Sequence, residues 1–142
     1  MNKPVITDNT ITIPSDQEFL PDVDVYIEGT LRGYGADEST IADIAISVSE
    51  LVNNAIAYGN RDSRDNPVKI SIATTNNTVE ISISDRGQGF DPNKIENPIA
   101  DENLLKVVGR GIFIVRSLMD KVDFDSTDKG TTVTITKSFK RP

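Results

Sequence analysis

The sequence has neither cysteine nor histidine in its 142 residues. The lack of cysteine excludes disulfides and thiolate metal sites. The lack of histidine excludes Ser-His and Cys-His nucleophile pairs, imidazole metal sites and a phosphorylated histidine. Long apolar runs are also missing: none approaches the ~20 residues that cross a bilayer, and the N-terminus has no signal-peptide core. We therefore expect no membrane association.

Positive charge is scarce as well. Lysine and arginine number 15 against 22 acidic residues, which gives a net charge of −7. This balance argues against a protein that binds the phosphate backbone of nucleic acid directly. An anionic ligand would have to be held locally, by backbone amides, a metal ion or a few cations. A protein partner fits the acidic balance better than DNA does.

The order of predicted elements favours one α+β domain over residues 1–142. Residues 1–9 read as a loose arm. Apolar periodicity predicts helices at 21–32, 37–58 and 109–122, and alternation predicts strands around 11–13, 68–72, 79–83, 122–124 and 133–135. Because strands and helices do not alternate regularly, we expect α+β layers rather than a doubly wound parallel sheet.

The helix predicted over 37–58 carries Glu50 and Asn54 nearly opposite its apolar stripe. A solvated polar face is the plain interpretation, and Asp43 and Ser47 share that face. However, Asn53-Asn54 sacrifices helix propensity, which a plain surface would not require. A carboxylate and an amide one turn apart could hold Mg²⁺, and the carboxylate could take a proton from a hydroxyl nucleophile.

The stretch "DRGQGF" follows the strand predicted around 79–83. Gly87 and Gly89 allow positive φ and leave no Cβ to obstruct a planar ligand. Asp85 could accept a hydrogen bond from an exocyclic amine, which adenine offers and guanine does not at that position. An ordinary turn with an exposed acid is the alternative.

A long segment, 91–108, precedes "GRGIFIV", and loops of this length are usually functional or disordered. We expect Gly109 and Gly111 to open a helix, whose free amides would attract phosphate. The dinucleotide-binding fingerprint fails, because Ile114 stands where the third glycine should be. A simple glycine-capped helix start is the alternative.

Together these segments resemble the Bergerat-fold (GHKL) ATPases. The N box would be "ELVNNAIAYGN", and the three glycine boxes "DRGQGF", "GRGIFIV" and "GTTVTI". The resemblance covers about Ile11 to Lys137. It implies a two-layer α/β sandwich, with a mixed, largely antiparallel sheet and helices on one face.

Within that superfamily the chain is similar to the bacterial anti-sigma-factor serine kinases. The resemblance implies a cytoplasmic, ATP- and Mg²⁺-dependent protein-serine kinase that sequesters a sigma factor or another effector. Its substrate would be a serine of a STAS-type anti-anti-sigma protein, and a homodimer is expected. Two alternatives stay open: a nucleotide-gated binding regulator with little or no kinase activity, and an adaptor that has lost nucleotide binding.

The resemblance also implies roles for single residues. Glu50 would be the general base and Asn54 would bind the Mg²⁺ that accompanies ATP. Asp85 would receive the adenine amine. The remaining implied contacts are the base pocket at Gly87 and Gly89, phosphate amides at Gly109 and Gly111, and adenine support from Thr132.

Residues 91–108 would form a lid over ATP. Lys106 and Arg110 are the candidates for a basic contact to the γ-phosphate. Relatives often have histidine near the end of the N box, where Tyr58 or its neighbourhood stands here, so no role transfers to that position.

Overall fold

The computed structural model describes residues 2–60, 63–87 and 102–139, with residues 102–108 described by their backbone alone. The described elements are, in chain order, β1 (Val5–Thr7), β2 (Thr10–Ile13), the 3₁₀ turn η1 (Gln17–Phe19), α1 (Leu20–Gly33), α2 (Glu38–Asn54), the π-helical turn η2 (Ala55–Gly59), β3 (Val68–Thr75), β4 (Thr78–Ser84), α3 (Glu102–Leu118), β5 (Lys121–Thr127) and β6 (Gly130–Ser138).

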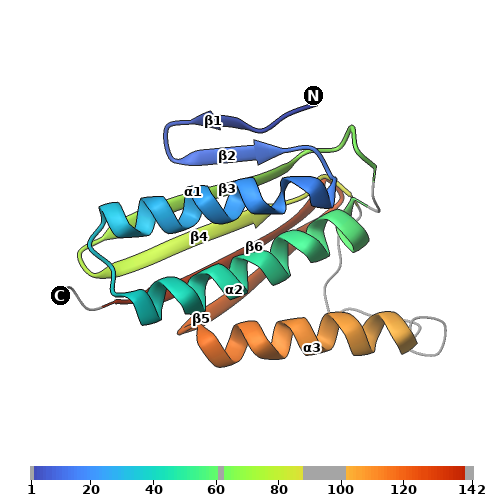
Figure 1. The fold of residues 1–142 in the computed structure, drawn as a ribbon. Helices are drawn as coiled ribbons and strands as arrows, with labels where there is room; N and C mark the ends of the chain where they lie inside the picture. The colour runs from blue at the N-terminus through green and yellow to red at the C-terminus, as the bar shows by residue number, and fades with distance from the viewer. Residues whose placement is uncertain (1, 61–62, 88–101, 140–142) are drawn as a thin grey trace.

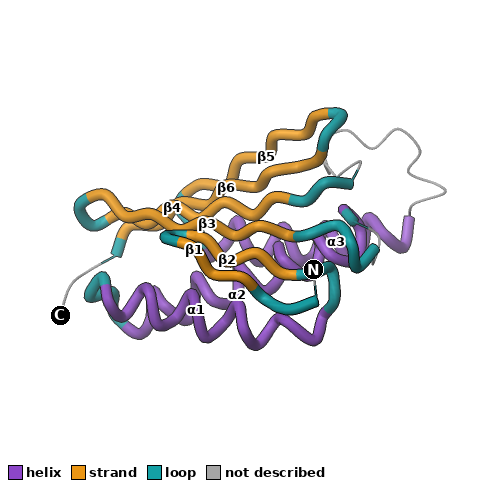
Figure 2. The backbone as a smooth tube through the Cα atoms, turned by 90° about the horizontal axis from the view of Figure 1, so that it is seen from above, coloured by secondary structure: helices purple, strands orange, loops and turns teal. Residues whose placement is uncertain are grey.

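The strands form one six-stranded sheet in the order β1-β2-β3-β4-β6-β5. Each neighbouring pair is antiparallel. Helices α1, α2 and α3 lie together on one face of this sheet, as Figures 1 and 2 show from two directions. The α+β prediction is therefore confirmed, and the described sheet is wholly antiparallel.

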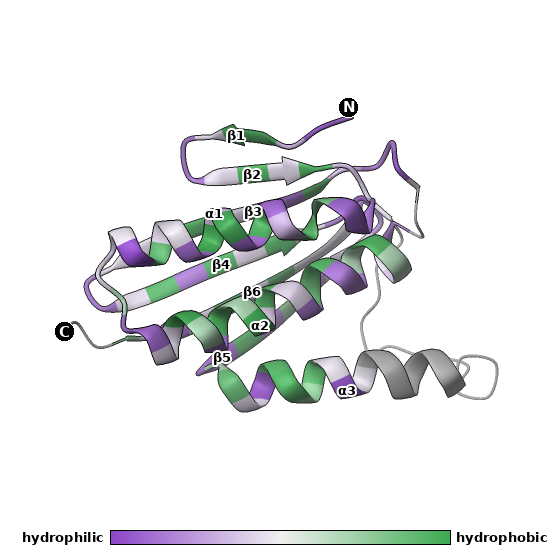
Figure 3. Ribbon diagram, in the orientation of Figure 1, coloured by the Kyte–Doolittle hydropathy of each residue, from purple (hydrophilic) through white to green (hydrophobic). Residues whose placement is uncertain are grey.

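Alternation of apolar and polar residues explains the sheet. Val68, Ile70 and Ile72 of β3 are buried, while the residues between them are exposed or half-buried. Since successive side chains point to opposite faces, the strand lays one apolar row against the helices. Figure 3 shows the same apolar recurrence along β4 and α2. The core lies between the two layers, and no helix among the described residues is long and apolar enough to cross a membrane.

The predicted loose arm is wrong for residues 5–7, which form β1 and pair with β2. The turn between these strands contains Asp8 at φ 48°. Aspartate tolerates this left-handed conformation better than most residues. The strand has only three residues, and they do not alternate between apolar and polar, so the sequence did not predict it. All three side chains are exposed in the structure.

The third helix begins earlier than expected. Helix α3 starts at Glu102, so Gly109 and Gly111 lie inside it instead of opening it. Neither proline nor glycine interrupts residues 102–108. A glycine costs a helix interior only ~1 kcal/mol, which packing elsewhere can outweigh. The prediction of a helix N-terminus at these glycines is wrong.

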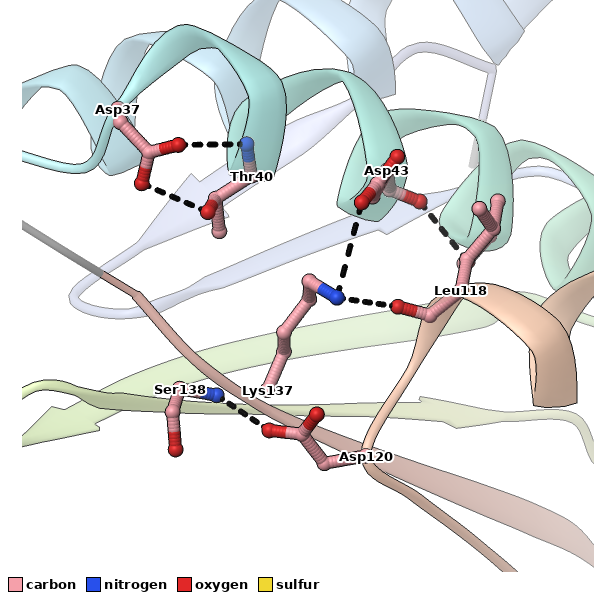
Figure 4. A network of polar contacts seen from close by, with 8 residues as sticks. Asp37, Thr40, Asp43, Leu118, Asp120, Lys137 and Ser138 are labelled. Atoms are coloured by element: carbon pink, nitrogen blue, oxygen red, sulfur yellow. Dashed lines mark hydrogen bonds and ion pairs between the residues drawn. The ribbon is translucent and has the colours of Figure 1, made fainter.

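A network of hydrogen bonds and an ion pair joins the N-terminal half of α2, the C-terminal end of α3 and the end of β6 (Figure 4). The Lys137 ammonium on β6 donates to the carbonyl of Leu118 and lies 3.6 Å from the Asp43 carboxylate on α2. Asp120 accepts a 2.7 Å hydrogen bond from the amide of Ser138. A lysine at the last carbonyl of a helix also suits the negative end of the helix dipole.

Candidate functional site

Asp85 lies where the end of β4 meets the start of β6. Its Oδ1 accepts hydrogen bonds from the amides of Gly87, at 3.1 Å, and Thr131, at 3.3 Å. Its own amide donates to the carbonyl of Thr131 at 2.9 Å. The carboxylate is therefore held by backbone on one side, and its other oxygen, Oδ2, lies beside Gly59.

Burial raises the pKa of the Asp85 carboxyl from 3.8 to about 6, although the hydrogen bonds from Thr131 and Gly87 oppose this shift. A carboxylate that is partly withdrawn from water accepts a strong hydrogen bond from a donor that enters its pocket. This is the environment expected of a side chain that binds a polar ligand rather than of an exposed turn acid.

Two glycines allow the end of η2 to touch the turn after β4. A Cβ on Gly59 would lie 2.3 Å from Asp85 Oδ2, and a Cβ on Gly87 would lie 1.6 Å from the carbonyl oxygen of Gly59. Both contacts are far too short for a side chain. Gly87 therefore serves a backbone–backbone contact in this structure.

A small pocket opens beside Asp85. The lining is apolar with a few polar groups, and it includes Leu51, Asn54, Asp85, Ile112, Phe124 and Thr131. Helices α2 and α3 and strands β5 and β6 thus meet the end of β4 at one hollow.

The polar side of α2 faces α3 instead of solvent. A Cβ on Gly111 would lie 2.8 Å from Glu50 Oε2 and 3.7 Å from Asn54 Nδ2, so α3 approaches both side chains closely. Ser47, on the same side, is fully buried. The structure therefore rules out a fully solvated face and brings Glu50 and Asn54 together one helical turn apart.

Asn54 carries an unsatisfied group. Its Nδ2 is buried and has no hydrogen-bond partner among the described residues. An unpaired buried amide is costly, and native structures rarely keep one unless a ligand, ion or water completes it. Because the two ends of an amide can be exchanged, Asn54 could present either a donor or an oxygen there.

The threonine in the pocket is Thr131, which is 3% exposed, and not the predicted Thr132. Thr132 pairs with Ser84 in the sheet, and the two hydroxyls lie 2.9 Å apart. Because strand residues alternate between faces, neighbours cannot both face the helices. The assignment of Thr132 is therefore corrected by one position.

The remaining predicted site residues either do not line this pocket or lie outside the described residues. Gly109 lies in the interior of α3, where amides bond to carbonyls four residues earlier, and a Cβ there would meet nothing within 4 Å. The helix start predicted at Gly109 and Gly111 is therefore wrong, while their contact with phosphates stays a prediction. Arg110 is exposed on α3. Gly89 and the side chain of Lys106 lie outside the described residues, as does the 91–101 part of the predicted lid.

Sequence reasoning missed several residues of the site. Gly59 and Asn60 lie at the end of the predicted N box, but the sequence analysis assigned no role to either residue. A glycine just after a helix is a signal that another segment approaches the backbone closely there. Phe124 was assigned to a strand only. Its ring lines the pocket and lies 5.9 Å from the Arg116 guanidinium carbon.

Comparison with known proteins agrees with this geometry. Residues 13–137 match the histidine kinase-like ATPase domain family. The chain belongs to this family. The predicted resemblance to the Bergerat-fold ATPases is thereby confirmed, and the match includes the described parts of all four boxes.

Individual relatives narrow the comparison. The serine-protein kinase RsbW of Staphylococcus aureus (strain JH9) is 29% identical over 136 residues, which cover 91% of this chain and 85% of RsbW. The RsbU and RsbW domains of Rv1364c from Mycobacterium tuberculosis superpose with a TM-score of 0.69 at 25% identity. That alignment covers 99% of this chain and 33% of the chain in that structure.

A more distant structure shares the fold alone. The blue-light activated histidine kinase EL346 of Erythrobacter litoralis has a TM-score of 0.56 at 20% identity, over 73% of this chain and 32% of its own. This likeness shows the fold, and the fold alone does not establish the activity of this chain.

Proposed function

We propose that this protein is an ATP-dependent serine-protein kinase that also acts as an anti-sigma factor. The observation that supports this most directly is the pairing of Glu50 with Asn54 under Gly111, next to a pocket that contains Asp85. The similarity to RsbW, which is named a serine-protein kinase, favours the same activity. Asp85 would accept the exocyclic amine of adenine, with Thr131 beside it in place of Thr132.

Glu50 would be the general base for transfer. The serine hydroxyl oxygen of the partner attacks the γ-phosphorus of ATP, and the bond from that phosphorus to the β,γ-bridging oxygen breaks. ADP leaves with the electron pair of that bond. The hydroxyl proton passes to the Glu50 carboxylate, so charge does not build up on the attacking oxygen. Lys106 and Arg110 stay predictions for contacts to the γ-phosphate.

Asn54 would hold Mg²⁺ together with the phosphates. When bound, the ion supplies positive charge that offsets the phosphate charge. The unpaired, buried amide of Asn54 fits this role, because hard cations take amide oxygens as ligands. No cluster of three or more acidic side chains that could hold a metal occurs among the described residues. The phosphates would therefore complete the coordination.

The proposed partners follow from the similarity to RsbW and from the acidic balance of the chain. The substrate would be a serine of a STAS-domain anti-anti-sigma protein, and the captured effector a sigma factor. Phosphorylation would release the STAS protein and free the kinase for the sigma factor. A homodimer in solution is part of the proposal.

A titration tests the nucleotide site without any partner. The purified chain is titrated with ADP and with IDP, in which a carbonyl replaces the exocyclic amine. We expect ADP to bind at least about 100-fold more tightly, because a site built for a donor rejects an analogue that lacks it. Asp85→Asn should abolish that preference. Equal binding of both nucleotides by the wild-type chain would contradict the assignment of Asp85.

A transfer assay tests the kinase. The chain is incubated with Mg-ATP and a STAS-domain protein from the same genome, and phosphoserine is measured. Glu50→Gln should lower the transfer rate at least about 100-fold, in the range that general bases contribute. Glu38→Gln is the matched control, because Glu38 lies at the start of α2 and is 77% exposed. Nucleotide-dependent capture of the partner without phosphoserine would favour the gated regulator instead.

A further inference from the structure

We propose that Asn60 is the positioning residue that sets the base selectivity of the pocket, an inference that rests on the proposed binding of adenine at Asp85. Asn60 follows η2 directly and is 3% exposed. It does not line the pocket, so it acts through the residues that do. Three segments of the chain meet at its side chain.

The amide of Asn60 is fully used. Its Nδ2 lies within hydrogen-bond distance of three acceptors, which share its two hydrogens: Ser15 Oγ at 2.8 Å, the carbonyl of Asn66 at 3.1 Å and the carbonyl of Pro67 at 3.2 Å. Its Oδ1 accepts from the amide of Arg86 at 2.9 Å. Since two acceptor carbonyls surround the nitrogen and an N–H faces the oxygen, only one orientation of the amide satisfies all four contacts.

The bond to Arg86 fixes the turn that carries Asp85. Arg86 lies between Asp85 and Gly87, and both of these touch Gly59, the residue before Asn60. The turn therefore rests on η2 through the glycine contacts and is bonded to it by Asn60. Without that bond, the turn after β4 would be held against η2 by the contacts of Gly59 with Asp85 and Gly87.

The selectivity of Asp85 depends on this register. Its Oδ1 is bound by Gly87 and Thr131, so a shift of the turn would move the carboxylate relative to the pocket. A hydrogen bond weakens steeply as its distance and angle depart from the optimum. Release of the turn should therefore cost the contact with an exocyclic amine more than it costs the apolar contacts of the base.

The test compares ADP with IDP for the full chain and two variants. Asn60→Ala removes the bond to Arg86, and we expect the ratio of ADP to IDP affinity to fall at least about 10-fold, mainly through weaker ADP binding. Ser15→Ala is the matched control. It removes one partner of Asn60, at a site 3% exposed, and leaves the bond to Arg86 in place. Its ratio should stay within about 3-fold of wild type.

Three outcomes would overturn the inference in different ways. An unchanged ratio in Asn60→Ala, or an equal fall in Ser15→Ala, would show that Asn60 serves stability alone. A wild-type chain that does not prefer ADP would remove the proposed function itself. Should Asn60→Ala fail to fold, hydrogen exchange of the wild-type chain decides: the Arg86 amide should exchange at least about 100-fold more slowly than an unstructured amide, and fast exchange would contradict the contact.

Discussion

At the scale of single residues, burial gives Asp85 its properties. The Asp85 carboxylate lies against Gly59 and two backbone amides and has a pKa of about 6. A half-buried acid that no cation among the described residues offsets destabilises the fold when it ionises. The residue that suits the ligand is therefore unfavourable for the unliganded protein.

This makes the stability of the protein depend on pH in a predictable direction. Because the folded-state pKa of Asp85 is raised above the 3.8 of the unfolded chain, the folded chain binds more protons between about pH 4 and pH 6. Stability contributed by Asp85 is therefore present below about pH 4 and is lost as the pH rises through 6.

Urea unfolding from pH 4 to 7 measures this effect. The free energy of unfolding of Asp85→Asn, relative to that of wild type, should rise over this range, because the variant lacks the ionising group. Asp123→Asn is the control, since the Asp123 side chain is 58% exposed. A constant difference between Asp85→Asn and wild type would contradict the raised pKa.

At the scale of elements, the contact between α2 and α3 determines the surroundings of the Glu50 and Asn54 side chains. Gly111 lets the backbone of α3 approach Glu50 and Asn54, and no larger residue would fit beside Glu50 Oε2 without a shift. The network around Lys137 holds the C-terminal end of α3. Both contacts join elements that are distant in sequence.

Gly111→Ala should separate catalysis from stability. The new methyl group would displace the flexible end of Glu50, so we expect transfer to fall at least about 10-fold. Stability should change by less than ~1 kcal/mol, because alanine is the better helix former. Gly29→Ala in α1 is the control: a Cβ there meets nothing within 4 Å, so it should leave transfer unchanged. Normal transfer in Gly111→Ala would argue against Glu50 as the base.

Lys137→Met should destabilise the fold by about 1–2 kcal/mol, because it leaves Asp43 and the Leu118 carbonyl without their partner. Urea unfolding at low salt measures the loss. Lys121→Met is the control. Lys121 lies 3.5 Å from Asp123 with both side chains more than half exposed, and such pairs contribute less than ~1 kcal/mol. Equal losses in the two variants would mean that the network adds nothing.

At the scale of the whole molecule, ligand binding and folding are coupled. The pocket is lined by residues from α2, η2, α3 and three strands, so it exists only when the two layers are assembled. A ligand that binds the folded state alone stabilises it by RT ln(1 + [L]/Kd).

Mg-ADP at 100 times its Kd should therefore add about 2.7 kcal/mol and raise the Tm by several degrees. Differential scanning calorimetry measures the shift. Removal of Mg²⁺ with EDTA should reduce it, since Asn54 would lose the ion that links it to the phosphates. Mg²⁺ without nucleotide should have little effect, and a large shift with the ion alone would point to a separate metal site.

Periodic patterns in the sequence were sufficient for much of the fold. Alternation placed β3, β4 and β6, and the 3.6-residue stripe placed α2, because burial of one face acts over a few residues. Asp85, Glu50 and Asn54 were predicted from local oddities: an acid between glycines, and asparagines inside a helix. The strand β1 was missed because its three residues are too few to show an alternation. The start of α3 was missed because Gly109 and Gly111 favoured a helix start there, although apolar residues recur at helical spacing before them, at Leu104, Leu105, Val107 and Val108.

The amino-acid order alone thus predicted most of the strands and helices, and the chemical groups that the chain can offer to a ligand. Only the tertiary structure decided that Thr131 faces the pocket instead of Thr132, that Gly111 makes room for Glu50, and that Asn60 reaches Arg86. Periodicity depends on neighbours within one or two turns. These contacts join residues 26 or more positions apart, and they form only when the sheet and the helices pack together.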